Sequence, residues 1–425
     1  MINVIYDATV VTNTFYKDGN RTGIFFAAWN ILNELVKRQD VHVTLYFSPE
    51  TIADGEKLRD SCYPGCDCLQ NVTKYKNLRS IYRKCRKLYA ESGKRKLKRL
   101  LLAFPLGILY VFFLLTLKPN KEKLKRNQVY FSPFFKIPKF VRKYNGLKPF
   151  VFVYDFIPLV LPQYYPKWKA FVVRVMDNYK EGDFFFFDSE NTRKDAARFF
   201  PEIVKENAAV ALLAAGKCFK PKKELALGAK IRNKYNIPSG KKYVFSLCSL
   251  EPRKNVVRIV RSFLKFIEKN KVDDLVLLVG GAVWTSFEKI LEKESIKWNK
   301  EQVVQTGYID DDDLSILYSN AEWFVYTSQY EGFGLPPLEA MQCGCPVITS
   351  NNSSLPEVVG DAGLMIDWES DEQHVDAYEK YYFDDEIRKE NGKKGLERAY
   401  AFSWHKSVAK MVRVMGGGGY VEYCL

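Results

Sequence analysis

One segment joins a strand to a helix through two glycines: Glu331-Gly332-Phe333-Gly334-Leu335-Pro336-Pro337-Leu338-Glu339. The apolar run Trp323–Tyr326 precedes it, and the helix that begins at its prolines ends at Gly344. The free amides and the positive end of a helix N-terminus bind anions, and glycine lets a phosphate approach the backbone closely. The segment therefore predicts an α/β fold with a diphosphate site, flanked by the carboxylates of Glu331 and Glu339.

A parallel sheet is predicted around this segment. Short apolar runs alternate there with helical patterns, at residues 243–247, 275–279, 303–306, 323–326, 346–349 and 363–366. Such continuous apolar runs are typical of strands that are buried on both faces of a parallel sheet. We place this Rossmann-like domain at residues 241–400.

A second sheet is predicted in the first half of the chain. Its strands are expected at residues 2–6, 41–47, 129–131, 150–154 and 184–187, with helices at 24–37 and 167–179. A chain of 425 residues exceeds what one core usually organises. We therefore predict a first domain at residues 1–215, a linker rich in Pro, Gly and charge at 216–240, and a final helix with a flexible tail at 401–425.

The glycine-rich segment resembles the signature of family 4 of the retaining glycosyltransferases, in which seven residues separate two glutamates. The resemblance extends through residues 344–350 and 353–363, and back to Gly307-Tyr308-Ile309 and Leu314. It implies the GT-B fold, in which two Rossmann-like domains with parallel sheets face each other across a cleft. In that fold the donor binds the second domain and the acceptor binds the first.

The same resemblance implies which residues hold a nucleotide-diphosphate sugar. In that family the first glutamate contacts hydroxyls of the donor sugar, the second contacts the ribose, and the amides between them bind the sugar and the phosphates. The residues of this chain that take these donor-side positions are Glu331, Gly332, Phe333, Gly334, Leu335, Glu339, Gly307, Tyr308, Ile309 and Leu314.

Basic residues follow the first strand of the second domain, in Ser249-Leu250-Glu251-Pro252-Arg253-Lys254-Asn255. A departing diphosphate gains negative charge, and a cation aimed at it stabilises the transition state more than the ground state. Lys254 matches a lysine of the family. Arg253 stands in for an arginine that many relatives carry where this chain has Ser249.

Two segments of the first domain resemble the family's acceptor side. Asp18-Gly19-Asn20-Arg21-Thr22-Gly23-Ile24 follows the first strand, where relatives bring a glycine-rich loop against the donor phosphate, although a plain turn and helix cap explain the same residues. In Tyr154-Asp155-Phe156, Tyr154 replaces a histidine of the family. Asp155 either acts on the acceptor hydroxyl or caps the next turn. Ser189 reads as a helix N-cap.

The resemblance favours retaining transfer by front-face attack that the leaving phosphate assists, with Glu331 positioning the sugar. No Asp-x-Asp motif occurs in a metal-binding context, because residues 310–313 read as the acidic start of a helix. We expect catalysis without a metal or other cofactor.

A basic and apolar insertion at residues 74–126 does not belong to this catalytic pattern. It holds 17 Lys and Arg against Glu91 and Glu122, so it carries the whole formal charge of +15. Residues 100–117 contain no charged side chain, and the stretch is long enough to cross most of a bilayer core. A single span would separate strands of one sheet, so we expect a monotopic element bent near Pro105 and Gly107.

The alternative is a helical insertion that packs on the first domain, but packing leaves the basic flanks unexplained, and these favour an anionic membrane surface. We predict no nucleic-acid binding, because few aromatic residues alternate with the basic ones. Nine scattered cysteines and the absence of a signal-peptide pattern indicate reduced thiols and a cytoplasmic location, peripheral at the inner face of the membrane.

We therefore expect a glycosyltransferase, possibly a mannosyl- or glucosyltransferase, that extends a lipid-linked glycan in polysaccharide or cell-surface glycan biosynthesis. A catalytically inactive, membrane-associated scaffold with the same fold is the alternative. A nicotinamide-dependent oxidoreductase is disfavoured, because no G-x-G-x-x-G follows the first strand.

Overall fold

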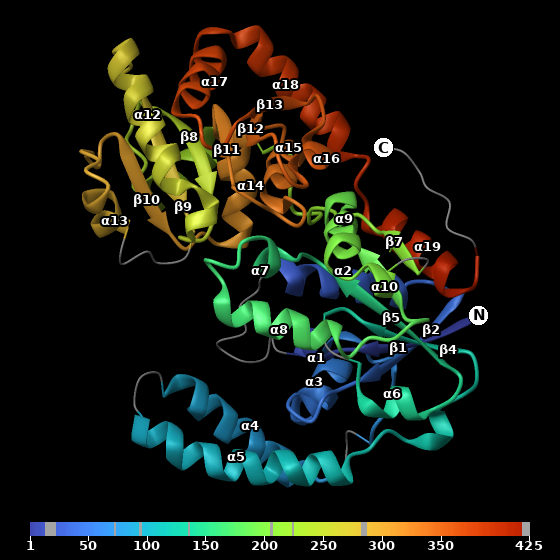
Figure 1. Cartoon of the computed structure of the whole chain (residues 1–425). Helices are drawn as coiled ribbons and strands as arrows, with labels where there is room; N and C mark the ends of the chain where they lie inside the picture. The colour runs from blue at the N-terminus through green and yellow to red at the C-terminus, as the bar shows by residue number, and fades with distance from the viewer. Residues whose placement is uncertain are drawn as a thin grey trace.

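The computed structural model describes residues 1–12, 23–71, 74–92, 96–134, 137–204, 207–222, 225–281 and 287–418. Two parallel sheets, each covered by helices on both faces, form the two domains (Figure 1). The first sheet has the strand order β3-β2-β1-β4-β5-β6-β7, and the second has the order β10-β9-β8-β11-β12-β13. The predicted GT-B architecture of two parallel α/β domains is confirmed.

The strands of the first sheet are β1 (Ile2–Asp7), β2 (Val41–Tyr46), β3 (Asp67–Cys68), β4 (Gln128–Ser132), β5 (Leu147–Val153), β6 (Phe184–Phe187) and β7 (Ala208–Val210). Those of the second are β8 (Lys242–Leu247), β9 (Leu275–Gly280), β10 (Val303–Gly307), β11 (Trp323–Tyr326), β12 (Val347–Ser350) and β13 (Gly363–Ile366). Every strand expected from the sequence forms. The two that were not expected, β3 and β7, are too short to give a pattern of their own.

The helices before the second sheet are α1 (Thr9–Thr12), α2 (Gly23–Val36), α3 (Ile52–Cys62), α4 (Lys76–Glu91), α5 (Lys96–Thr116), η2 (Lys121–Lys123), α6 (Lys139–Lys143), α7 (Ile157–Val160), α8 (Pro166–Met176), α9 (Glu190–Phe199), α10 (Pro201–Val204) and α11 (Leu225–Lys234). The later ones are η3 (Pro252–Lys254), α12 (Val256–Asn270), α13 (Phe287–Lys293), α14 (Asp311–Asn320), α15 (Leu335–Gln342), α16 (Leu355–Val359), α17 (Asp371–Phe383), α18 (Asp385–Ala399) and α19 (Trp404–Met415).

The first strand of each sheet lies at its middle, and the chain then builds outward in both directions. β1 pairs with β2 and β4, while β8 pairs with β9 and β11. The strand order reverses at these pairs, and ligands of open α/β sheets bind at the carboxyl ends of the strands beside such a reversal. The strands β1 and β11, which come before α2 and α15 in the chain, lie beside these reversals.

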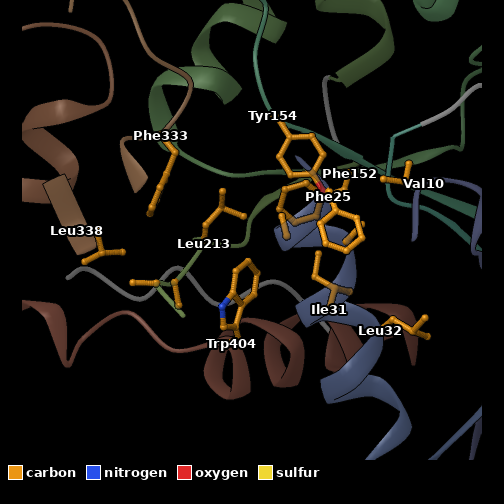
Figure 2. Packing of buried hydrophobic residues seen from close by; sticks show 14 of the residues in the cluster. Val10, Phe25, Ile31, Leu32, Phe152, Tyr154, Leu213, Phe333, Leu338 and Trp404 are labelled. Carbon is orange, nitrogen blue, oxygen red and sulfur yellow. The ribbon is translucent and has the colours of Figure 1, made fainter. Parts of the chain in front are cut away.

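The end of the chain returns to the first domain. α19 packs on α2, and Figure 2 shows Trp404 pointing from α19 into the buried cluster that contains Ile31 and Leu213. The same cluster includes Phe333 and therefore runs through both domains. Of the tail that we expected to be flexible, residues 419–425 lie outside the described part of the chain.

The predicted linker at residues 216–240 is not a simple connecting segment, because it contains α11. Pro221 and Pro238 flank the helix, as do Gly216 and Gly240, whereas Gly228 lies within it among residues that are mostly helix formers. Lys234 at the end of α11 contacts Asp310 and Asp313 at the start of α14, each at 2.5 Å. α11 is thus held to the second domain by ion pairs.

The insertion folds as a helical hairpin of α4 and α5 (Figure 1). The helix α5 runs from Lys96 to Thr116 with Pro105 inside it, so the chain stays helical where we predicted a bend near Pro105 and Gly107. An internal proline removes one backbone hydrogen bond, but the helix continues because the surrounding leucines have a high helix propensity.

Candidate active site between the domains

Glycines 332 and 334 allow a close approach at the start of α15. Gly334 has a φ of +122°, and a Cβ there would lie 2.8 Å from a methyl group of Leu355. A Cβ on Gly332 would lie 2.0 Å from the carbonyl oxygen of Tyr154, which belongs to the first domain. The loop that carries Glu331 is therefore pressed against the end of β5 across the domain boundary.

Glu331 is buried and receives three polar contacts at one oxygen. Its Oε1 accepts hydrogen bonds from Lys254 Nζ at 2.6 Å and from the Tyr326 hydroxyl at 2.9 Å, and it lies 2.9 Å from Arg253 Nη1. Burial alone would raise the pKa of Glu331, but the charges of Lys254 and Arg253 outweigh it and lower the pKa to about 2. The carboxylate is therefore ionised at neutral pH.

Arg253 connects this cluster to the first domain. Its Nε donates to the Tyr165 hydroxyl at 2.8 Å, and that hydroxyl in turn donates to the carboxylate of Glu251. Burial lowers the pKa of Arg253, but the negative charge of Glu331 more than compensates and raises it overall. Tyr165 precedes α8, so a side chain of the first domain orients the guanidinium. The sequence patterns did not identify Tyr165.

Asp155 lies beside Gly332, since its Cβ is 2.9 Å from where a Gly332 Cβ would be. Its Oδ1 accepts a hydrogen bond from the Ile157 amide at 3.0 Å, as expected of a capping residue. Burial raises the pKa of Asp155, and this hydrogen bond opposes the shift. The structure thus has the capping contact and also places the carboxyl group next to the Glu331 loop.

Gly23 begins α2 and faces the start of α15. A Cβ on Gly23 would lie 3.4 Å from Cδ1 of Leu335, so the N-termini of two helices from different domains approach each other. Both ends offer free amides and partial positive charge to an anion. The remainder of the predicted loop, Asp18 to Thr22, lies outside the described residues.

The other predicted donor residues lie around the same edge of the second sheet. Glu339 accepts a hydrogen bond from the Tyr318 hydroxyl at 3.2 Å. Gly307 ends β10 with a φ of +70°, and β9 and β8 separate β10 from β11. Tyr308 is exposed there. The side chains of the remaining three are buried, so only their backbone can face a ligand: Ile309, Leu314 and Phe333.

Hydrogen bonds across the domain boundary fix the Glu331 loop from outside. Ser189 caps α9 as predicted, and its hydroxyl also donates to the carbonyl oxygen of Gly332 at 2.6 Å; Thr192 donates to the same oxygen at 3.1 Å. The carboxylate of Glu357 in α16 accepts from the first two amides of α9, at 2.7 and 2.6 Å. These contacts were not foreseen, since a capping residue alone gives no sign of an interdomain partner.

For the sugar transfer that the sequence predicts, changing Tyr165 to phenylalanine is expected to lower kcat/KM by about tenfold, because losing a hydrogen bond to a partly buried charge costs roughly 1–3 kcal/mol. The ring remains, so the packing is retained. Tyr164→Phe is the matched control, because Tyr164 is its exposed neighbour. Equal rates for the two variants would show that Tyr165 does not orient Arg253.

The chain is similar in sequence and in fold to known glycosyltransferases. Residues 228–398 match the family model of glycosyl transferases group 1. The chain is similar to the O-antigen chain mannosyltransferase B of Escherichia coli, with 37% identity over 40% of this chain and 44% of that protein. It is also similar to the serotype-specific mannosyltransferase WbdA of Escherichia coli, with 28% identity over 59% of this chain and 31% of that protein. The chain thus spans less than half the length of these curated relatives.

Two solved structures share the fold along almost the whole chain. WaaG, a glycosyltransferase involved in lipopolysaccharide biosynthesis, superposes with a TM-score of 0.62 at 16% identity, over 98% of this chain and 100% of that one. Sucrose-phosphate synthase from Thermosynechococcus elongatus gives a TM-score of 0.63 at 16% identity, over 98% and 99%. Together, these similarities show a GT-B fold whose second domain matches the model of glycosyl transferases group 1.

Proposed function

We propose that this chain is a retaining glycosyltransferase that moves a sugar from a nucleoside-diphosphate donor to a hydroxyl of a lipid-linked glycan, in polysaccharide or cell-surface glycan biosynthesis. The observation that carries the proposal is the buried Glu331 in contact with Lys254 and Arg253, at the start of α15. The names of the two Escherichia coli relatives make mannose the first sugar to test.

The chemistry follows from where charge develops. The diphosphate would lie between the starts of α2 and α15, with Lys254 and Arg253 stabilising the negative charge that grows as it leaves. Glu331 would hold the sugar and face the positive charge that develops at its anomeric carbon. Because two protein cations supply the countercharge, we also propose catalysis without a metal, so that adding a chelator leaves the rate unchanged.

The test is a panel of uridine-, guanosine- and adenosine-diphosphate sugars, with donor hydrolysis, transfer and product anomer measured by NMR. We expect one donor to be consumed and its anomeric configuration to be retained; inversion would contradict the mechanism. Calorimetry with the free nucleoside diphosphates distinguishes the transferase from the alternative, an inactive scaffold. Absence of binding to any of them would favour the scaffold.

We further propose that the α4–α5 hairpin binds an anionic membrane. Of the helices in the described residues, α5 alone is long and apolar enough to cross a membrane, and 6% of its most apolar window is buried. Its exposed side chains recur every three or four residues and form one stripe: Leu97, Leu100, Leu101, Phe104, Ile108, Val111, Leu114 and Leu115. Such a stripe, with exposed basic residues at both ends of the helix, suits a helix lying in the membrane interface.

The arginines of α4 have a different role from the lysines around α5. Arg79 is buried and pairs with Glu56 at 2.9 Å, and Arg83 pairs with the buried Asp54 at 2.6 Å. These pairs fix α4 to α3. The strands that flank the hairpin, β3 and β4, belong to one sheet, so both ends of the hairpin lie on the same side of any membrane.

The double variant Leu101→Glu and Phe104→Glu is expected to reduce binding to phosphatidylglycerol vesicles at least tenfold in a flotation assay. Burying one such side chain contributes about 1.5–3 kcal/mol, whereas each basic residue near the surface contributes about 1 kcal/mol. The matched control is Phe383→Glu with Tyr400→Glu, since both side chains are exposed on the second domain. If both doubles float equally well, the stripe is not the membrane surface.

A further inference from the structure

An apolar cavity of about 280 Å³ opens beside the Glu331 cluster. Its walls come from the end of β5, from α7 and α8, and from the loop that carries Glu251 and Arg253. The helix α8 lies over the cavity with one face, which presents Trp168, Phe171, Val172 and Val175. Of these, Trp168 and Phe171 remain exposed. The apolar face of α8 therefore borders the cavity, and two of its aromatic side chains remain exposed to solvent.

The charged groups of the lining are Asp155, Glu251 and Arg253. Arg253 lies 3.3 Å from Glu251 and 2.9 Å from Glu331, and Asp155 adjoins Gly332, so all three lie next to the Glu331 loop. Tyr165 joins these groups through its contacts with Glu251 and Arg253. The wall that α8 contributes is aliphatic and aromatic. A ligand in this cavity is thus polar at the reaction centre and apolar beyond it.

A sugar ring does not suit the apolar part. Each of its hydroxyl groups would lose water without gaining a hydrogen bond there, which costs about 1–3 kcal/mol per group. A chain of methylene groups loses nothing of this kind and gains about 0.8 kcal/mol for each group buried. Burying a hydroxyl group here is unfavourable, whereas burying a methylene group is favourable. The apolar wall therefore selects an aliphatic chain.

We propose that this cavity binds the aliphatic chain of a lipid-linked acceptor, next to the hydroxyl that receives the sugar. This inference rests on the proposed transferase function. Because the cavity adjoins the Glu331 cluster directly, the acceptor has a short glycan between its lipid and the reacting hydroxyl. The α5 stripe would hold the enzyme at the membrane from which such a chain enters.

The test compares methyl α-mannoside with decyl α-mannoside as acceptors, below the micelle concentration of the latter. We expect KM for the decyl compound to be lower by at least about tenfold, since several buried methylene groups suffice for that factor. Val172→Asp, which places a carboxylate in the cavity wall, should abolish this preference while leaving transfer to methyl mannoside and donor hydrolysis within about twofold. Val173→Asp is the matched control, because Val173 is exposed on the same helix and does not line the cavity.

Three kinetic results would overturn the inference: equal KM values for the two acceptors, equal loss of preference in both Asp variants, or a Val172→Asp defect that affects methyl mannoside as strongly. The last result would point to a sugar ring stacked against α8. A decyl mannoside brominated on its chain provides a binding test without turnover, because it should quench the fluorescence of Trp168, identified by difference from Trp168→Phe. Quenching without any transfer would refute the proposed reaction and still support the aliphatic site; no quenching overturns the site.

Discussion

Replacing Glu331 with alanine is expected to lower the rate of sugar transfer on the order of 10³-fold, because loss of one preorganised electrostatic group in an active site typically costs 10²- to 10³-fold and here two cations also lose their partner. Lys254 and Arg253 both contact Oε1 of this carboxylate. Without it they repel each other, and neither keeps its direction toward a diphosphate. We expect kcat to fall while the nucleoside diphosphate still binds, as measured by steady-state kinetics and calorimetry.

Two further variants separate charge from shape in this cluster. Glu331→Gln keeps the size of the side chain and removes its charge, so it should be nearly as inactive as the alanine variant. Tyr326→Phe removes a neutral donor to the same oxygen and should cost roughly tenfold. Near-normal transfer by Glu331→Gln would mean that the charge is not required. Because the pKa of Glu331 is about 2, ionisation of Glu331 should give no inflection at the ordinary glutamate pKa of about 4.3.

The sequence was sufficient for the sheets, because buried parallel strands need continuous apolar runs and these stand out in the chain. It was also sufficient to select Glu331, Lys254 and Arg253, which the structure brings into contact, since each follows a strand that ends at the same edge of one sheet. Patterns of this kind involve residues that are close together in the chain, so the structure that they form can be predicted from the sequence.

The contacts between the domains could not be predicted in this way. Ser189 and Gly332 are 143 residues apart, and Tyr165 and Arg253 are 88 apart, so no periodicity relates them. Likewise, the total charge of the insertion could be counted from the sequence, but the role of each basic residue could not be assigned. Arg79 and Arg83 attach α4 to α3 through ion pairs, and these pairs depend on where the hairpin folds back.

Replacing Gly332 with alanine is expected to lower transfer about 10²-fold or more, although the change adds a single methyl group. That methyl would lie 2.0 Å from the Tyr154 carbonyl oxygen, and backbone cannot move aside as a flexible side chain can. The loop and the end of β5 must separate, which also stretches the hydrogen bonds from Ser189 and Thr192 to Gly332. A displacement of about 1 Å in reacting groups can cost 10²-fold.

The measurement is kcat for transfer together with small-angle scattering and the affinity for the nucleoside diphosphate. We expect kcat to fall, the separation of the domains to increase, and nucleotide affinity to change less than tenfold, because most of the proposed donor contacts lie in the second domain. Gly65→Ala is the control, since a Cβ at Gly65 meets nothing within 4 Å. Wild-type transfer by Gly332→Ala would refute the idea that the reaction requires this close approach of the two domains, and Glu331 would then act from a loop that is free to move.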